Sequence, residues 1–168
     1  MKSKKVNHSK GFTIIETLIV LAIAATIFLV VFLAVSALDR SSRNTARKDD
    51  AAAILAAVGD FAGDNNGSLP TTIAAAGPPS YTISGGAGTV QVSVKLSHYT
   101  DSTGTAKVSF NATGSGGTLT ANTDMLVVEE NATCASSSTV SGTATTGAYA
   151  VLFAIESGSG YVPQCLGS

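Results

Sequence analysis

The chain opens with a long apolar run that differs from everything after it. From Phe12 to Leu38 almost every position is apolar, and Thr26 is the only polar residue between Leu18 and Val35. A helix of about 20 residues spans the hydrocarbon core of a bilayer, at about 1.5 Å per residue. The pattern therefore predicts a membrane-crossing helix over residues 12–38. The alternative is a helix buried in a protein core, but the rest of the chain predicts nothing large enough to surround it.

After this run the apolar positions narrow to one stripe of helical spacing. Its members are Ala51, Ile54, Leu55, Val58, Phe61 and Ala62. Asp50, Asp60 and Asp64 are expected on the other faces. The Gly- and Asn-rich residues 63–70 form a strong stop signal. We therefore expect an amphipathic helix over residues 39–66 that continues into a head formed by residues 67–168.

The head shows strand patterns in place of helical ones. Residues 89–96 alternate strictly, with Val90, Val92, Val94 and Leu96 on the face expected to be buried. Further strands are expected near residues 106–110, 124–129, 149–156 and 161–165. Residues 71–80 are interpreted as a loop, and the Ser/Thr-rich residues 132–147 as an exposed loop. The predicted fold class is α+β, a long N-terminal helix packed on a small antiparallel sheet.

Charge is concentrated at the start of the chain. The whole chain has a net charge of −1, but residues 1–11 contain four lysines and no acid. Those lysines are Lys2, Lys4, Lys5 and Lys10. By the positive-inside rule they stay in the cytoplasm and the head is exported. The basic residues just after the apolar run would favour the opposite orientation, with the head in the cytoplasm. Acidic residues are interleaved with them, however, and reduce their net charge.

Glu16 places a carboxylate inside the apolar run. Such a group costs about 2.5–3.5 kcal/mol at a bilayer centre and less near the interface. One explanation is that Glu16 reaches the lipid headgroups. The sequence around it suggests another, because the segment from Lys10 to Glu16, KGFTIIE, opens an apolar helix after a basic leader. This segment resembles the class III signal of type IV prepilins.

The resemblance implies how the chain is processed and assembled. A prepilin peptidase would remove residues 1–11 by cutting after Gly11 and would methylate the new N-terminus at Phe12. Glu16 would then be the fifth residue and would pair with the Phe12 amine of a neighbouring subunit, since a buried charge needs a partner. The implied product is a structural subunit of a type IV pilus, a helical homopolymer with roles in adhesion, twitching motility or DNA uptake.

The resemblance also implies partners and locations. Besides the peptidase, they are a pilus assembly platform and its ATPase, and membrane lipid before assembly. The protein would lie in the cytoplasmic membrane with its N-terminus inside, and later in an extracellular pilus. Lys95 and Lys107 are the only basic residues after Lys48. Direct binding of nucleic acid is therefore not expected.

Cys134 and Cys165 are the only cysteines. An exported head favours a disulfide between them, and many type IV pilins close a C-terminal loop in this way. The bond would contribute about 3–4 kcal/mol by loop entropy. Two free buried thiols are the alternative. A zinc site is not supported, because zinc needs about four ligands and His98 is the only histidine of the exported part.

No catalytic constellation is visible, and we expect neither an enzyme nor a cofactor. A triad built on His98 and Asp101 has no further support. The head carboxylates that could supply oxygens to Ca²⁺ lack the spacing of a calcium loop and are interpreted as solvated charges. They are Asp101, Asp124, Glu129, Glu130 and Glu156.

Three alternatives to a pilus subunit remain open. The first is a pseudopilin of a type II secretion or competence system; the major pseudopilins bind calcium near the C-terminus, where residues 160–168 have no acid. The second is a membrane-anchored or secreted binding module. The third is ordinary secretion with cleavage before Leu38, although the apolar run is long for a signal peptide.

Overall fold

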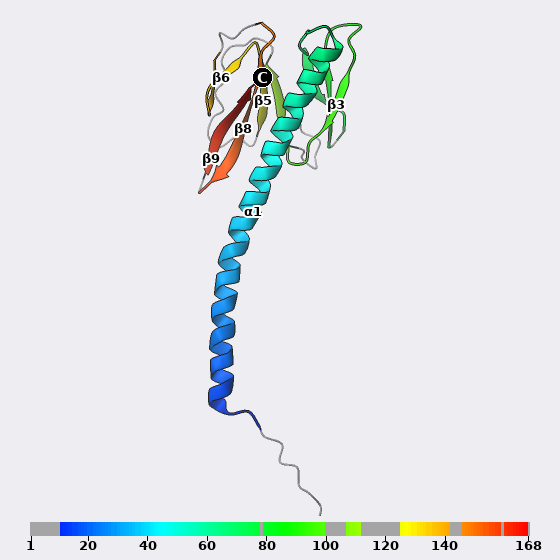
Figure 1. Ribbon diagram of the computed structural model, residues 1–168. Helices are drawn as coiled ribbons and strands as arrows, with labels where there is room; N and C mark the ends of the chain where they lie inside the picture. Colours follow the sequence, from blue (N-terminus) through cyan, green and yellow to red (C-terminus); the bar gives the residue numbers. More distant parts are fainter. Residues whose placement is uncertain are drawn as a thin grey trace, which may run out of the picture. The chain divides into compact units, whose positions relative to one another are not determined.

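The computed structural model describes residues 11–77, 79–99, 107–111, 125–141, 146–158 and 160–167. The chain divides into two compact units, Met1–Asp39 and Arg40–Ser168. The first contains the apolar part of helix α1 (Ile14–Asp64). The second contains the rest of α1 and all nine strands of the described residues (Figure 1). An α+β fold with one long N-terminal helix is therefore confirmed.

Helix α1 ends where the sequence predicts. Asn66 and Gly67 have positive φ angles of 54° and 79°, a conformation that glycine adopts at little cost. The Gly67 N–H donates to the Ala62 carbonyl at 2.7 Å, which satisfies one of the last carbonyls of the helix. The chain is thereby turned away from the helix axis after a run of 51 helical residues.

The first sheet has the order β1-β2-β3 and is antiparallel throughout. Its strands are β1 (Thr72–Ala75), β2 (Ser80–Ser84) and β3 (Val92–Lys95). The loop expected over residues 71–80 is wrong, because β1 pairs with β2 and Ile73 is buried. In β3, Val92 and Val94 are half-buried as expected, whereas Val90 lies before the strand and is 53 % exposed.

The second sheet has the order β4-β5-β8-β9. Its strands are β4 (Val108–Asn111), β5 (Leu126–Glu130), β8 (Tyr149–Ser157) and β9 (Gly160–Gly167). All four correspond to strands that the sequence predicts. β4 runs parallel to β5, so this pair departs from the antiparallel sheet that we expected.

The third sheet is a small hairpin made of β6 (Thr133–Ser136) and β7 (Thr139–Ser141). It lies in the stretch interpreted as an exposed loop, of which residues 142–145 are outside the described residues. Val140 is only 8 % exposed and packs with Ala132, Ala150 and Leu152 on the side of β8. The exposed loop expected here is therefore wrong for the two strands of the hairpin, because Val140 is buried against β8.

The main core lies between α1 and the two larger sheets, which flank the C-terminal end of the helix in Figure 1. The predicted stripe is confirmed, since Ile54, Val58 and Phe61 are fully buried. They pack with side chains of both sheets, namely Ile73, Tyr81, Ile83, Leu126, Val128, Val151 and Phe153. One helix thus serves both sheets as a common support.

Asp50 was expected on a polar face, and that prediction is wrong. The residue is 4 % exposed and its carboxylate holds the segment after β3. Oδ1 accepts from the Ser97 N–H at 2.7 Å, and Oδ2 accepts from the N–H groups of His98 at 2.6 Å and Tyr99 at 3.1 Å. Charge-assisted bonds of this kind offset the cost of burying the carboxylate.

Candidate functional site

The N-terminal segment presents its predicted processing residues openly. Gly11, Phe12 and Thr13 precede α1, and Phe12 is 84 % exposed. A Cβ added to Gly11 would meet no atom within 4 Å. Local packing therefore gives no reason for a glycine at this position.

Thr13 and Glu16 form the start of the helix. The Glu16 N–H donates to Thr13 Oγ1, and the Thr13 N–H donates to Glu16 Oε2, both at 3.4 Å. This reciprocal pattern is a capping box, which satisfies N–H groups left free at a helix N-terminus. The sequence contains its signature, Thr-x-x-Glu, but our interpretation of Glu16 considered only the membrane and the amine of a neighbouring subunit. Glu16 therefore has a local role as well.

The apolar side chains of α1 are exposed along the first unit. The helix contains a stretch long and apolar enough to cross a membrane, and none of that stretch is buried. A buried core helix is therefore wrong for this chain. The exposed side chains include Leu18, Leu21, Ile27, Phe28, Leu33 and Leu38. Such a surface needs lipid or other apolar helices around it.

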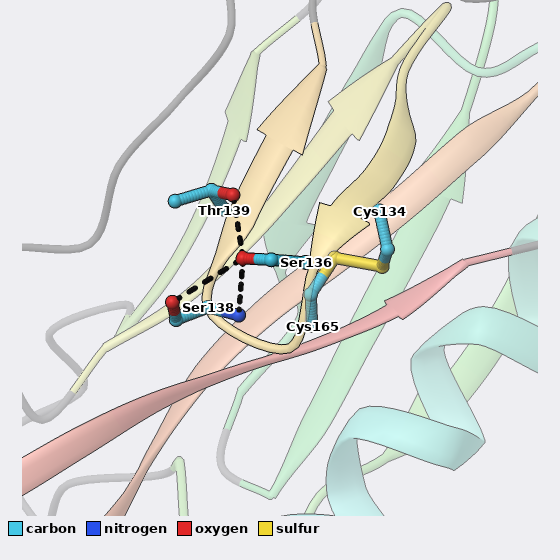
Figure 2. The surroundings of a disulfide bond; sticks show 5 residues. All are labelled: Cys134, Ser136, Ser138, Thr139 and Cys165. Carbon is cyan, nitrogen blue, oxygen red and sulfur yellow. Dashed lines mark hydrogen bonds between the residues drawn. A yellow bond between two sulfur atoms is a disulfide. The ribbon is translucent and has the colours of Figure 1, made fainter.

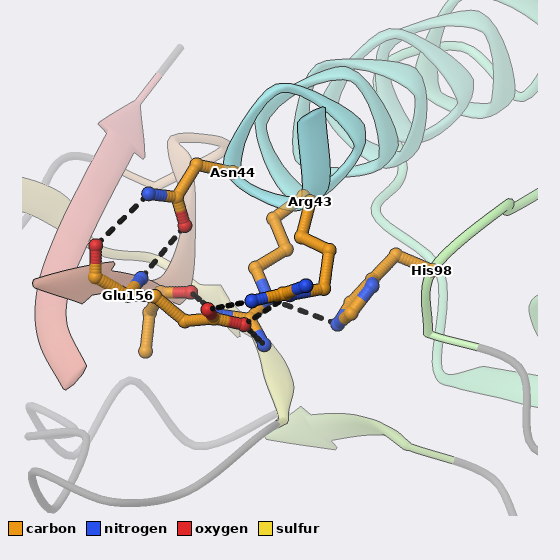
Figure 3. A network of polar contacts seen from close by, with 6 residues as sticks. Arg43, Asn44, His98 and Glu156 are labelled. Atoms are coloured by element: carbon orange, nitrogen blue, oxygen red, sulfur yellow. Dashed lines mark hydrogen bonds and ion pairs between the residues drawn. The ribbon is translucent and has the colours of Figure 1, made fainter. Parts of the chain in front are cut away.

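In the second unit, arginines of α1 bind the end of β8 (Figure 3). Arg43 forms a bidentate pair with Glu156, in which Nε donates to Oε1 at 2.9 Å and Nη2 donates to Oε2 at 2.7 Å. Arg47 Nη2 lies 3.1 Å from Glu156 Oε1. The Asn44 side chain pairs with the Glu156 backbone, with Nδ2 donating to its carbonyl and Oδ1 accepting from its N–H. The hydrogen bond from Arg43 holds the pKa of Glu156 below its usual value.

Arg47 is the most enclosed of these side chains, with 1 % of the residue exposed. Its Nε donates to His98 Nε2 at 2.9 Å, and its guanidinium lies 4.8 Å from the centre of the Tyr161 ring. His98 therefore uses Nε2 to accept from an arginine, which is not the arrangement of a catalytic base. Asp101, the other member of the triad that we considered, lies outside the described residues. This cluster fixes α1 to the sheet.

Two carboxylates of β5 do not fit their sequence interpretation as solvated charges. Glu129 is 1 % exposed and Glu130 is 8 % exposed. Asn111 Nδ2 donates to Glu129 Oε1 at 3.1 Å, whereas Glu129 Oε2 and Glu130 Oε1 have no hydrogen-bond partner within the part of the chain that the structure describes. Burial raises the pKa of both carboxyl groups. Strand alternation directs the two side chains to opposite faces of the sheet, which separates them.

Cys134 and Cys165 form a disulfide that joins β6 to β9 (Figure 2). The bond fastens the β6–β7 hairpin to the edge strand of the second sheet. Beside it, Ser136 Oγ lies 2.7 Å from Thr139 Oγ1 and accepts from the Ser138 N–H at 3.3 Å, which closes the hairpin turn. In the described ranges, no three His, Cys, Asp or Glu side chains come together in a way that could hold a metal ion.

Comparison with known proteins identifies the first part of the chain. Residues 6–35 match the prokaryotic N-terminal methylation motif, the class III signal peptide of type IV pilins. The chain carries a prepilin-type processing signal. The match contains Gly11, Phe12 and Glu16 and covers less than a fifth of the chain. No curated protein and no solved structure matches the chain.

Proposed function

We propose that the protein is a structural subunit of a type IV pilus. It would be made as a membrane prepilin, cleaved after Gly11, N-methylated at Phe12 and polymerised through its N-terminal helix. The observation that carries the proposal is the match to the processing motif over residues 6–35, and the proposed cleavage position after Gly11 is in an exposed segment just before α1. The roles proposed for the filament are adhesion, twitching motility or DNA uptake.

The exposed apolar helix supports assembly as the fate of the mature chain. In the membrane this surface is covered by lipid, and in a filament it would be covered by the helices of other subunits. Head-to-tail packing of one kind of subunit gives an open helical array, as a growing filament requires. The proposed machinery is the prepilin peptidase, an assembly platform and an ATPase that supplies the energy.

Cleavage after Gly11 creates an amine at Phe12, four residues before Glu16. We propose that this amine and the carboxylate of Glu16 in a neighbouring subunit neutralise each other in the apolar filament core. The exported head would keep its Cys134–Cys165 bond outside the cytoplasm, where disulfides persist. The proposed locations are the cytoplasmic membrane before assembly and the extracellular pilus afterwards.

The proposal is tested by the intact mass and N-terminal sequence of the protein from its native cells. A chain that starts at Phe12 and is heavier by one methyl group is expected. A start at Leu38 or at Met1 would contradict prepilin processing and would favour a secreted or anchored binding module.

Electron microscopy of sheared cell surfaces then separates a pilus from a pseudopilus. Long surface filaments containing the mature chain are expected.

The proposed pairing of Glu16 is tested in the same assay. Glu16→Ala should still insert into the membrane and be cleaved but form few filaments. Mature chain confined to the cell envelope, with a head whose melting temperature rises in calcium, would favour a pseudopilin. Normal filaments from Glu16→Ala would remove the proposed pairing.

A further inference from the structure

The turn that follows α1 contains a dipeptide with a chemistry of its own. Asn66 is followed by Gly67, and it is the only asparagine of the chain that precedes a glycine. Both residues are exposed, and a Cβ added to Gly67 would meet no atom within 4 Å. Asparagine is one of the heat-labile residues of proteins, and glycine has no side chain to shield its backbone nitrogen. The Gly67 nitrogen can therefore attack the side-chain amide of Asn66 once it is free to do so.

In the folded head this nitrogen is engaged by the helix. The Gly67 N–H donates to the Ala62 carbonyl at 2.7 Å, so the bond that caps the helix also holds the attacking atom. The positive φ angles of 54° at Asn66 and 79° at Gly67 belong to the same cap. Helix ends open locally at a lower free energy than the whole domain. Any reaction at this dipeptide should therefore depend on how often the last turn of α1 opens.

Asn65 lies beside this dipeptide and is held in place. Its Nδ2 donates to the Phe61 carbonyl at 2.8 Å and to the Val90 carbonyl at 3.1 Å. Its Oδ1 accepts from the Val90 N–H at 2.8 Å. These bonds fasten the end of α1 to the segment before β3. Asn65 therefore helps to keep the last turn closed, and it serves as an internal reference because a residue with a side chain follows it.

We propose that Asn66–Gly67 is a spontaneous modification site, at which opening of the helix end lets Asn66 lose its side-chain amide. The Gly67 nitrogen gives its proton to the solvent and attacks Cγ of Asn66. The Cγ–Nδ2 bond breaks, and the amide nitrogen takes up a proton and leaves as ammonia. Water then opens the cyclic imide, either at Cγ to give aspartate or at the backbone carbonyl to give isoaspartate. The net reaction consumes one water and releases one ammonia, and it needs no enzyme.

Both products weaken the cap that held the site closed. A carboxylate at position 66 adds a negative charge near Asp64, at the end of α1 where the helix dipole is already negative. Isoaspartate also routes the backbone through the side chain, which moves the Gly67 N–H away from the Ala62 carbonyl. Older copies of the head should therefore have a looser helix end. This consequence holds whether or not the chain forms a filament, so it stands apart from the proposed pilus function.

Peptide mapping by mass spectrometry tests the site in the full chain, purified in detergent and incubated at mildly alkaline pH. Asn66 is expected to convert to aspartate and isoaspartate, while Asn65 in the same peptide keeps its amide. In denaturant, where strain at the positive φ does not enter, Gly67→Ala should slow the conversion at least about tenfold, because its Cβ shields the nitrogen. An intact Asn66 in the folded chain after the denatured chain has converted fully would overturn the site, and so would equal conversion of Asn65.

Comparison of folded with denatured chains tests the control by the helix end. Denaturation should speed the conversion of Asn66 at least about tenfold, because it releases the Gly67 N–H from the Ala62 carbonyl. Asn65→Ala removes the bonds to Val90 and should speed conversion in the folded chain severalfold, with no change in the denatured chain. Equal rates in the folded and denatured wild type would overturn this control. An Asn65→Ala chain that converts no faster than the wild type when folded would also contradict it.

Discussion

Arg43 and Glu156 are 113 residues apart in the sequence and form a bidentate ion pair. Arg47, one helical turn further on, also lies close to this carboxylate. Glu156 thus links α1 to the end of β8 through polar contacts, in addition to the apolar packing of the helix on the same strand. The two arginines differ sharply in their surroundings, because the side chain of Arg43 is 49 % exposed and that of Arg47 is 2 % exposed.

Glu156→Ala should destabilise the head strongly, since it removes this carboxylate from beside the buried guanidinium of Arg47. The expected loss is about 3 kcal/mol or more in the free energy of unfolding. Arg43→Ala is the matched variant and should cost about 1 kcal/mol or less, because its pair is exposed to solvent. Denaturant unfolding of the two variants measures the difference. Equal losses of unfolding free energy in the two variants would mean that the contact between Glu156 and the buried Arg47 adds nothing to the stability of the head.

The low pKa of Glu156 gives the same contact a pH signature. Its folded-state pKa lies below the unfolded value, so its contribution is complete above the unfolded pKa and is lost as pH falls through the folded pKa. The melting temperature of the wild type should therefore fall on acidification below about pH 4.5 more steeply than that of Glu156→Gln. Parallel melting curves at all acidic pH values would contradict this.

Glu129 and Glu130 should act in the opposite direction. Burial raises their pKa in the folded head, so folding favours the neutral carboxyl groups. Their contribution is complete below the unfolded pKa and is lost as pH rises through the folded pKa. Glu129→Gln and Glu130→Gln should stabilise the head at pH 7 and have little effect near pH 4. Thermal unfolding of both variants across this range measures the effect, and stabilisation that does not depend on pH would argue against ionisation as its cause.

Removing the disulfide should loosen the β6–β7 hairpin. Cys165→Ser is expected to lower the free energy of unfolding by about 3–4 kcal/mol, mainly by freeing the unfolded chain. Reduction of the wild type should produce a similar loss, and Cys134→Ser with Cys165→Ser provides the control without a free thiol. An unchanged melting temperature after complete reduction would show that the bond contributes no stability.

Gly59 permits a close approach between α1 and β8. A Cβ at this position would lie 2.7 Å from the Tyr149 hydroxyl, so the clash should make Gly59→Ala about 1–3 kcal/mol less stable than Gly63→Ala. Gly63→Ala is the matched control, because no atom lies within 4 Å of the added Cβ and alanine favours helix. Removing the hydroxyl with Tyr149→Phe should rescue much of the loss, as double-mutant unfolding would measure. If Tyr149→Phe does not restore stability, the Tyr149 hydroxyl is not the group with which the added Cβ clashes.

The sequence could predict the features that depend on neighbouring residues. Helix α1, its stop after Asp64 and the buried Ile54 stripe all have local periodic signals. The pairing of Cys134 with Cys165 had a single solution once a bond was assumed. The processing segment was also recognisable, because Gly11, Phe12 and Glu16 lie at fixed spacing in one short stretch.

The features that were missed depend on partners distant in the chain. Asp50 has the sequence context of a surface acid, and only the N–H groups of residues 97–99 make its burial favourable. Strand β1 has four residues, one of them buried, so it lacks an alternating pattern. The parallel pairing of β4 with β5 has no local signal either, because periodicity identifies strands but not their direction.

The route of these contacts decides how the head would carry a pulling force. The contacts at Glu156 are the first that a pull from the N-terminal part of α1 would load, ahead of the apolar core further along the helix, and β8 is paired in turn with its antiparallel neighbour β9. Cys165 lies on β9, and its disulfide with Cys134 transmits the force to the β6–β7 hairpin. The strands β8 and β9 share eight paired positions, so the hydrogen bonds between them can act together when the strands are pulled lengthwise. The end of β8 is therefore where the head should yield first, while the disulfide keeps the far side of the sheet intact.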